Sequence, residues 1–323
     1  MKTTRLVLLM LLLSAALVFA GGQQEPAPQP QPAEPTEEQE PRAITLWTTE
    51  EQPERLEVQE NIAAAFEDET GISVEVVPVT ENEMGQRVTA AFSAGELPDV
   101  IYHPLNFSLN WEEAGILNAT AATEVVENLS ESTYGAGALN LVETGGEYAA
   151  VPVDGWTQLL VYRADLFEEE GLDAPTDYES ILEAIDALHN PPEMYGFVAA
   201  TDPSQVYMMQ VFEHIALANG VDVVDNNGNV TLDTPAMRET LEFYKELAEA
   251  SPPGNLYWQQ SRELFMAGQA AMIVWSPFIL DELAGLRDSV PVTATDDPTS
   301  SALARETSFV TSLAGPSNPS GSG

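Results

Sequence analysis

The chain has 323 residues, enough for a sizeable core and two lobes, and its hydrophobic fraction of 44% is ordinary for a globular protein. It contains no cysteine, which excludes disulfides, a thiolate nucleophile and Cys-ligated zinc or iron–sulfur clusters. Its 52 Asp and Glu outnumber its 11 Lys and Arg and give a net charge of −41. Such a charge repels nucleic acid and anionic membrane surfaces, and it disfavours an anionic substrate.

The first residues have the pattern of a secretion signal. Lys2 and Arg5 precede an apolar run over 6–18 that is short for a membrane span, and a small residue ends the predicted signal peptide, residues 1–20. The alternative is a membrane anchor. A bacterial lipoprotein needs a cysteine directly after cleavage, and Gly21 stands there. We therefore expect a periplasmic or extracellular protein without a lipid anchor.

Residues 21–42 are rich in Gln, Pro and Glu, and this composition predicts a disordered tether. Strands and helices then alternate, and a βαβαβ order implies parallel strands with right-handed crossovers. Ligands of such sheets lie beyond the carboxyl ends of the strands, where Trp47 and Tyr102 stand. The predicted elements are strand 44–47, helix 55–70, strand 72–79, a helix across 84–92 that ends near Gly95, and strand 99–102.

The second half predicts a similar alternation without a tandem repeat. A capping box of Thr176 and Glu179 predicts one helix start, and Thr234 followed by Pro235 predicts another. The predicted strands are 151–153, 159–162, 195–200 and 270–275, and the predicted helices are 176–188, 205–219, 235–250, 262–267 and one that opens at 276–277.

Six segments, in order, resemble the solute-binding proteins of carbohydrate ABC importers, of the maltodextrin-binding type. Together they cover roughly residues 43–313. The segments are ITLWT, AAFEDETGISVEVVPV, AAFSAGELPDVIYH, LNWEEAGILNAT, GGEYAAVPVDGWTQLLVYRADLFEEEGLDAPTDYESILEAIDAL and LFMAGQAAMIVWSPF.

The resemblance implies an α/β, two-lobed periplasmic-binding-protein fold with crossover hinge strands and a ligand cleft between the lobes. It implies a first lobe over 43–152 with a return near 292–313, and a second lobe over 156–290. The family continues for several more helices, so residues 314–323 are expected to be a truncated C-terminal end. The implied partners are a small carbohydrate ligand and the membrane subunits of an ABC permease. We expect a monomer without cofactor, metal or nucleic acid.

Sugars present apolar C–H faces and hydroxyl groups, which match aromatic rings and carboxylates respectively. The expected ligand contacts are therefore aromatic and acidic residues at strand ends and crossovers, and the resemblance points to Trp156 first. The candidates are Trp47, Glu50, Tyr102 and His103 in the first lobe, Asp154 and Trp156 in the crossover, and Tyr207, Trp258, Trp275, Ser276 and Phe278 in the second lobe.

Each candidate also has a purely structural interpretation. Trp156 could pack in the hinge, Asp154 could belong to a turn before Gly155, and Glu50 could be a charge at a helix start. A lone histidine such as His103 is more often structural than ligand-binding. Tryptophan, tyrosine and phenylalanine commonly serve only to fill a core.

Other functions find little support in the motifs. No G-x-S-x-G, H-E-x-x-H or P-loop motif occurs, and the three histidines are scattered. Chance pairs of carboxylates are certain among 52 acids, so they do not indicate a glycosidase. We expect no enzyme. Two alternatives stay open: the same fold binding a cationic ligand such as a polyamine or iron, and a sensory protein that presents its ligand to a receptor.

The acidity leads to a prediction about salt. It either keeps the surface solvated or adapts the protein to a saline medium. The Debye length falls from about 10 Å at about 0.1 M salt to about 3 Å at about 1 M, so salt weakens the repulsion among acids. On the second interpretation, the free energy of unfolding in urea is higher in about 1 M than in about 0.1 M KCl. Equal stability in both solutions would contradict it.

Overall fold

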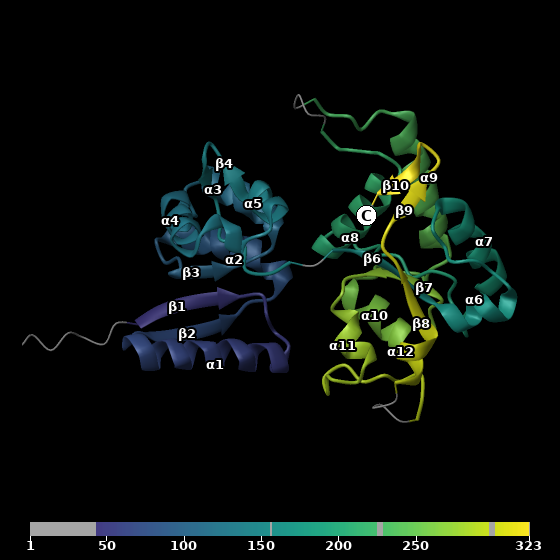
Figure 1. The fold of residues 1–323 in the computed structure, drawn as a ribbon, viewed down its shortest axis with the longest axis horizontal. Helices are drawn as coiled ribbons and strands as arrows, with labels where there is room; N and C mark the ends of the chain where they lie inside the picture. The colour runs from purple at the N-terminus through teal and green to yellow at the C-terminus, as the bar shows by residue number, and fades with distance from the viewer. Residues whose placement is uncertain (1–42, 156, 225–228, 297–300, 323) are drawn as a thin grey trace, which may run out of the picture. The chain divides into compact units, whose positions relative to one another are not determined.

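A computed structural model describes residues 43–155, 157–224, 229–296 and 301–322. The predicted signal peptide and tether, and Trp156, lie outside the described residues. Among the residues described, no helix has the length and apolar content needed to cross a membrane. The described chain forms two α/β lobes with separate sheets, which are introduced in turn below (Figure 1).

The first lobe is built on the predicted βαβαβ unit. Its three strands are parallel in the order β2-β1-β3, so the βαβαβ prediction is confirmed. The carboxyl ends of β1 and β3 lie side by side, because Thr48 is in register with Tyr102. The elements are β1 (Ala43–Thr48), α1 (Pro53–Thr70), β2 (Ser73–Pro78), α2 (Glu81–Ala94) and β3 (Val100–Tyr102).

The two faces of this sheet are covered unequally. On one face, Met84 and Val88 of α2 are fully buried in a cluster that includes Trp47. Helix α1 contacts β2, yet no residue of α1 is buried. Its apolar residues Val58 and Ile62 remain 55% and 64% exposed. The first lobe therefore has its core between the sheet and α2.

Short helices complete the first lobe. Trp111 is buried and stacks on Phe107 with ring centroids 4.4 Å apart, so it is a core residue of this lobe. The elements are η1 (Leu105–Phe107), α3 (Ser108–Glu113), α4 (Ala119–Leu129), η2 (Glu131–Thr133), α5 (Ala136–Val142), β4 (Glu143–Thr144) and β5 (Glu147–Tyr148).

The crossover between the lobes has no regular structure where a strand was predicted. Residues 151–153 form no strand, and Val153 is 75% exposed. Pro152 lacks the N–H that a strand ladder needs, and the valines find no sheet to pack against. The apolar alternation here was a misleading signal.

The second lobe is organised around an antiparallel sheet in the order β7-β6-β8. Its core is much larger than that of the first lobe and includes the fully buried Leu160, Ile181, Phe197 and Ile273. The elements are β6 (Leu159–Arg163), α6 (Ala164–Glu170), α7 (Tyr178–Leu188), α8 (Val206–Ala218), α9 (Pro235–Glu249), α10 (Trp258–Met266), β7 (Met272–Trp275), α11 (Ile279–Leu283), α12 (Ala302–Glu306), β8 (Thr307–Val310), β9 (Leu313–Gly315) and β10 (Asn318–Ser322).

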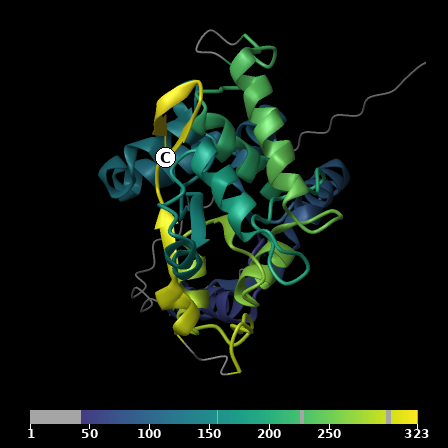
Figure 2. The same cartoon turned by 90° about the vertical axis from the view of Figure 1, so that its right-hand side faces the viewer.

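The C-terminal strands correct one expected boundary. Residues 292–313 were expected to return to the first lobe, but β8 pairs with β6 and β9 pairs with β10, and β9 and β10 contact α8 (Figures 1 and 2). Fully buried Val292 and Leu303 belong to the second lobe's core, which explains why this segment stays there.

Helix starts follow the predicted chemistry with small shifts. Thr234 accepts a hydrogen bond from the Met237 amide at 3.1 Å, as an N-cap should. The capping box of α7 is formed by Asp177 and Ser180, one residue later than predicted. Helix α10 begins at Trp258, so this residue is helical and not in a loop.

The β9–β10 hairpin is held by Asn219, and this gives a stability prediction. The side chain of Asn219 accepts from the Ser317 amide at 2.7 Å and donates to the Ala236 carbonyl at 2.9 Å. A Cβ on Gly315 would lie 2.4 Å from Asn219 Oδ1. Gly315→Ala should therefore lower the free energy of unfolding by about 1–3 kcal/mol in urea titrations.

Gly137 is the matched control, because a Cβ there meets nothing within 4 Å and the residue lies in α5. Gly137→Ala should be neutral or stabilising. Equal effects of the two substitutions would contradict the packing argument.

Candidate functional site

An open pocket of about 400 Å³ lies where the crossover meets α1 and the start of α11. Its lining combines two arginines, two aspartates and one aromatic ring. The lining residues are Arg55, Asp154, Gly155, Pro277, Phe278, Leu280, Asp281 and Arg287.

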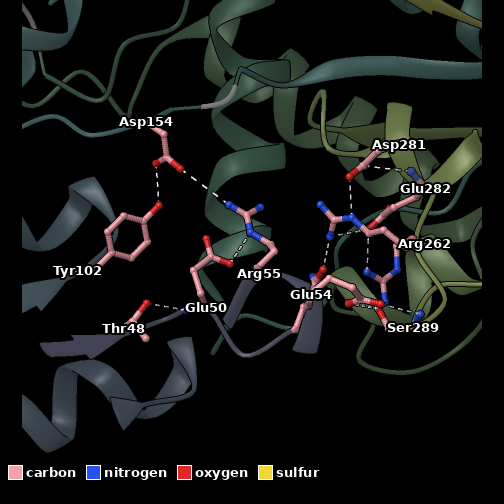
Figure 3. A network of polar contacts seen from close by, with 12 residues as sticks. Thr48, Glu50, Glu54, Arg55, Tyr102, Asp154, Arg262, Asp281, Glu282 and Ser289 are labelled. Carbon is pink, nitrogen blue, oxygen red and sulfur yellow. Dashed lines mark hydrogen bonds and ion pairs between the residues drawn. The ribbon is translucent and has the colours of Figure 1, made fainter. Parts of the chain in front are cut away.

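Arg55 connects the acidic residues on the first lobe's side of the pocket. Its Nε lies 2.6 Å from Glu50 Oε2, and its Nη2 lies 3.8 Å from Asp154 Oδ2 (Figure 3). The hydroxyl of Tyr102 donates to Asp154 Oδ1 at 2.7 Å. The guanidinium carbon is 4.0 Å from the centroid of Phe278, a cation–π contact. Arg55 thus joins residues from three separate parts of the chain.

The sheet explains why Glu50 and Tyr102 meet here. Thr48 and Tyr102 end neighbouring parallel strands, and the Thr48 hydroxyl accepts from the Glu50 amide at 3.1 Å as the chain turns. Burial raises the pKa of Glu50 despite the opposing effect of Arg55. Burial, together with the hydrogen bond to Asp154, also raises the pKa of Tyr102, so its hydroxyl stays protonated and remains a donor.

Glu282 is the corresponding centre in the second lobe. Its side chain is buried, and its Oε1 lies 3.1 Å from Arg262 Nη1 and 3.8 Å from Arg287 Nη1. Arg287 also pairs with Asp281 at 2.6 Å, and its guanidinium carbon is 5.5 Å from the Phe278 centroid. Burial raises the pKa of Glu282, which is the cost of holding a carboxylate away from water.

Aromatic rings extend this cluster into the second lobe. Trp275 packs edge-on against Tyr207 at 5.4 Å and tilted against Trp258 at 6.3 Å. The guanidinium carbon of Arg262 is 4.9 Å from the Trp258 ring. Within the described part of the chain, Trp275 Nε1 and Glu282 Oε2 are buried without a hydrogen-bond partner. Water or a polar ligand atom is the natural partner for such groups.

The predicted site residues thus fall into two sets. Asp154, Glu50, Tyr102 and Phe278 meet around Arg55, and Tyr207, Trp258 and Trp275 pack together behind Arg262. Ser276 directly follows β7, is buried, and its carbonyl accepts from the Ile279 amide at 3.2 Å at the start of α11. Tyr207 donates to the Val274 carbonyl at 2.7 Å, so its hydroxyl is already occupied.

Two candidates, Trp47 and His103, are half-buried and pack against other residues of the first lobe instead. Trp47 packs in the cluster with Met84 and has Arg87 over its ring at 4.7 Å. His103 Nδ1 is 2.9 Å from the Pro104 carbonyl and its ring lies edge-on to Trp111 at 5.0 Å, while burial lowers its pKa. Both side chains make packing contacts within the first lobe, Trp47 with Arg87 of α2 and His103 with Trp111 of α3. Trp156 lies outside the described residues.

The arginines were missed by sequence reasoning. The chain has 11 Lys and Arg, of which Lys2, Arg5 and Arg42 lie outside the described residues, so eight are described. Three of these eight, Arg55, Arg262 and Arg287, are in this network. Their scarcity in so acidic a chain was the available signal, because a rare cation is expected where acids must be neutralised.

The arrangement suits a neutral, hydroxyl-rich molecule. A hydroxyl group can donate to a carboxylate and accept from a guanidinium, and the pocket offers Asp154 and Asp281 beside Arg55 and Arg287. Because each arginine has an acidic partner, a lone anion finds no uncompensated positive charge here. The described residues contain no group of three or more His, Asp or Glu arranged to hold a metal ion.

Residues 50–298 match the family of bacterial extracellular solute-binding proteins. The chain belongs to this family. The matched range contains the pocket and the Glu282 cluster, so both are features of a solute-binding protein. Both lobes of the described structure fall largely within it.

Relatives of known annotation extend the comparison. The chain is 30% identical over 241 residues to the ABC transporter periplasmic-binding protein YcjN of Escherichia coli, covering 74% of this chain and 56% of that protein. It is 29% identical over 157 residues to an arabinooligosaccharide-binding protein of Halalkalibacterium halodurans, covering 46% of this chain and 35% of that protein. The chain therefore spans about half of such relatives or less.

Solved structures share the fold. A solute-binding protein of Agrobacterium radiobacter in complex with ribitol has a TM-score of 0.69 at 24% identity, covering 86% of this chain and 68% of that chain. The GacH receptor of Streptomyces glaucescens has a TM-score of 0.68 at 21% identity, covering 85% and 68%. These similarities confirm the two-lobed α/β fold of this solute-binding protein.

The buried Glu282 gives a prediction for this family member. Removing one partner from a buried ion pair leaves the remaining charges uncompensated, which typically costs about 3–5 kcal/mol. Glu282→Ala should lower the free energy of unfolding by about that amount, because Arg262 and Arg287 both lose their shared carboxylate. Glu263→Ala, at an exposed position on α10, should change it by at most about 0.5 kcal/mol. Similar effects of the two variants in urea titrations would refute a structural role for Glu282.

Proposed function

We propose that this protein is the receptor of an ABC importer and captures a neutral sugar, sugar alcohol or oligosaccharide in the pocket around Phe278. The ligand would then be delivered to the membrane subunits of a permease. The protein would be exported and would act outside the cell membrane. It would bind its ligand and release it chemically unchanged. The single observation that carries the proposal is a pocket of alternating guanidinium and carboxylate groups around an aromatic ring, in a member of a solute-binding family.

The chemistry of the lining supports a sugar. The Phe278 ring offers an apolar face for C–H groups, and Asp154 and Asp281 can accept hydrogen bonds from hydroxyls. Arginine donors complete the match for hydroxyl oxygens. One relative whose name specifies an oligosaccharide, and a related structure bound to ribitol, agree with this ligand class.

A binding role also fits the acids better than catalysis. The carboxylates of Glu50, Asp281 and Glu282 are each engaged with an arginine. A glycosidase instead needs one protonated acid and one free carboxylate on either side of the bond to be cleaved. Engaged carboxylates can fix a ligand without turning it over.

Capture would work by a population shift. A ligand that contacts residues of both lobes favours the state in which those residues are close together. A dissociation constant of about 1 μM corresponds to about −8 kcal/mol, which one stacked face and several hydrogen bonds can supply.

Calorimetry against a ligand panel tests the function. We expect saturable binding of a neutral saccharide or sugar alcohol, with a heat-capacity decrease from apolar burial. The panel should contain mono- and oligosaccharides, sugar alcohols, spermidine and ferric citrate. Binding of spermidine or iron alone would replace the proposal with the cationic alternative, and turnover of a saccharide would refute the binding role.

Phe278→Leu tests the pocket itself. Leucine keeps apolar volume but removes the flat face, so affinity for the saccharide found in the panel should fall about tenfold, or about 1.4 kcal/mol. Phe92→Leu is the control, because Phe92 is 42% exposed on α2, outside the pocket lining. Unchanged affinity of the Phe278 variant would place the ligand elsewhere.

A further inference from the structure

The first turn of α1 makes a second connection between the lobes, separate from the crossover. Ser289, which follows α11, donates to Glu54 through its amide at 3.0 Å and through its hydroxyl at 2.7 Å (Figure 3). The side chain of Arg287 also donates to Gln52. The residues in these pairs are 235 positions apart in the sequence, so only the tertiary structure brings them together.

These contacts are specific in geometry. Both carboxylate oxygens of Glu54 are used, one by the Ser289 amide and one by its hydroxyl, which fixes the direction of approach. Gln52 is the N-cap residue of α1, but its side chain makes no capping hydrogen bond and is therefore available for Arg287. The hydrogen bonds from Ser289 lower the pKa of Glu54, which keeps the carboxylate ionised at neutral pH.

Of the four residues in these contacts, only Arg287 also lines the pocket. Arg55 and Phe278 form the neighbouring contact and do line the pocket, whereas Gln52, Glu54 and Ser289 do not. A hinge motion about the crossover would separate α1 from the segment after α11 and break these bonds. They therefore stabilise one relative placement of the lobes even without ligand.

We propose that Gln52 and Glu54, together with Arg287 and Ser289, form a latch that holds the lobes together in the absence of ligand. The latch raises the fraction of molecules that are competent to close on a ligand. An apparent dissociation constant equals the intrinsic constant divided by that fraction, so the latch also tightens binding. This consequence for capture rests on the proposed function, but the latch itself does not depend on the ligand.

The absence of cysteine makes a direct test possible, because two introduced cysteines would be the only labelling sites. Glu69→Cys on α1 and Glu242→Cys on α9 are both exposed and lie in different lobes. Spin labels attached to these two cysteines report the distance between the lobes in double electron–electron resonance spectroscopy. The measurement uses the ligand-free protein.

Glu54→Ala and Ser289→Ala are the test variants in this labelled background. Glu54→Ala removes both hydrogen bonds, so the ratio of molecules at the parent distance to molecules at longer distances should fall about fivefold. Ser289→Ala should lower this ratio by less, because the backbone amide of residue 289 can still donate to Glu54. Glu57→Ala, exposed on the same helix, removes the same charge and should leave the distribution unchanged.

The outcomes separate the latch from the function. A distance distribution that is unchanged in both test variants, with circular dichroism showing a folded protein, would overturn the latch. An equal shift in Glu57→Ala would also overturn it, because loss of charge alone would then be the cause. A shift confined to the test variants supports the latch even if no saccharide of the panel binds, and in that case only the proposed function fails.

Discussion

The guanidinium groups of Arg55 and Arg287 approach one aromatic ring, that of Phe278, from different lobes. Each guanidinium is neutralised by acids of its own lobe or of the crossover. Arg55 pairs with Glu50 and Asp154, whereas Arg287 pairs with Asp281 and Glu282. In a chain with 52 acids and 11 basic residues, this is where positive charge is concentrated. The pocket lining and the contact between the lobes both depend on this arrangement.

The two lobes support this site with different resources. The second lobe has an extensive core. The desolvation cost of burying the Glu282 carboxylate is offset by ion pairs with two arginines. The first lobe has a small core around Met84, Val88 and Trp111, and Ile62 of α1 is 64% exposed. The first turn of α1 nevertheless supplies Arg55 and Glu54, so a sparsely packed helix carries residues that matter for both the pocket and the latch.

Among the buried polar atoms of the second lobe, Trp275 Nε1 and Glu282 Oε2 have no hydrogen-bond partner within the described residues. A buried polar atom without a partner costs free energy, and proteins keep such atoms mostly where water or a ligand satisfies them. Trp275 ends β7 and Glu282 lies on α11, so both belong to the second lobe.

Secondary structure and helix caps follow from local sequence patterns. The β-branched runs, the apolar spacing and residues such as Gly95 and Thr234 specify strands, helices and caps through neighbouring atoms, and the βαβαβ elements of the first lobe were predicted within a few residues. The predicted strand 195–200 was wrong, because these residues form isolated bridges with Ala270 and Ile273 and no strand. Tyr102 and Glu50 were predicted as site residues because the carboxyl ends of parallel strands meet at one edge, and Asp154 because a carboxylate in the crossover could accept hydrogen bonds from hydroxyl groups.

Contacts between residues that are far apart in the sequence depend on how the chain folds in three dimensions. Val153 follows a strand-like pattern but lies exposed in the crossover, and residues 307–310 join β6 instead of returning to the first lobe, because sheet pairing depends on which edge is available. Trp47 packs against the first lobe's core cluster, and His103, which follows β3, packs against Trp111. The pairing of Arg55 with Phe278, and of Glu54 with Ser289, joins residues more than 200 positions apart, and no local pattern encodes such a contact.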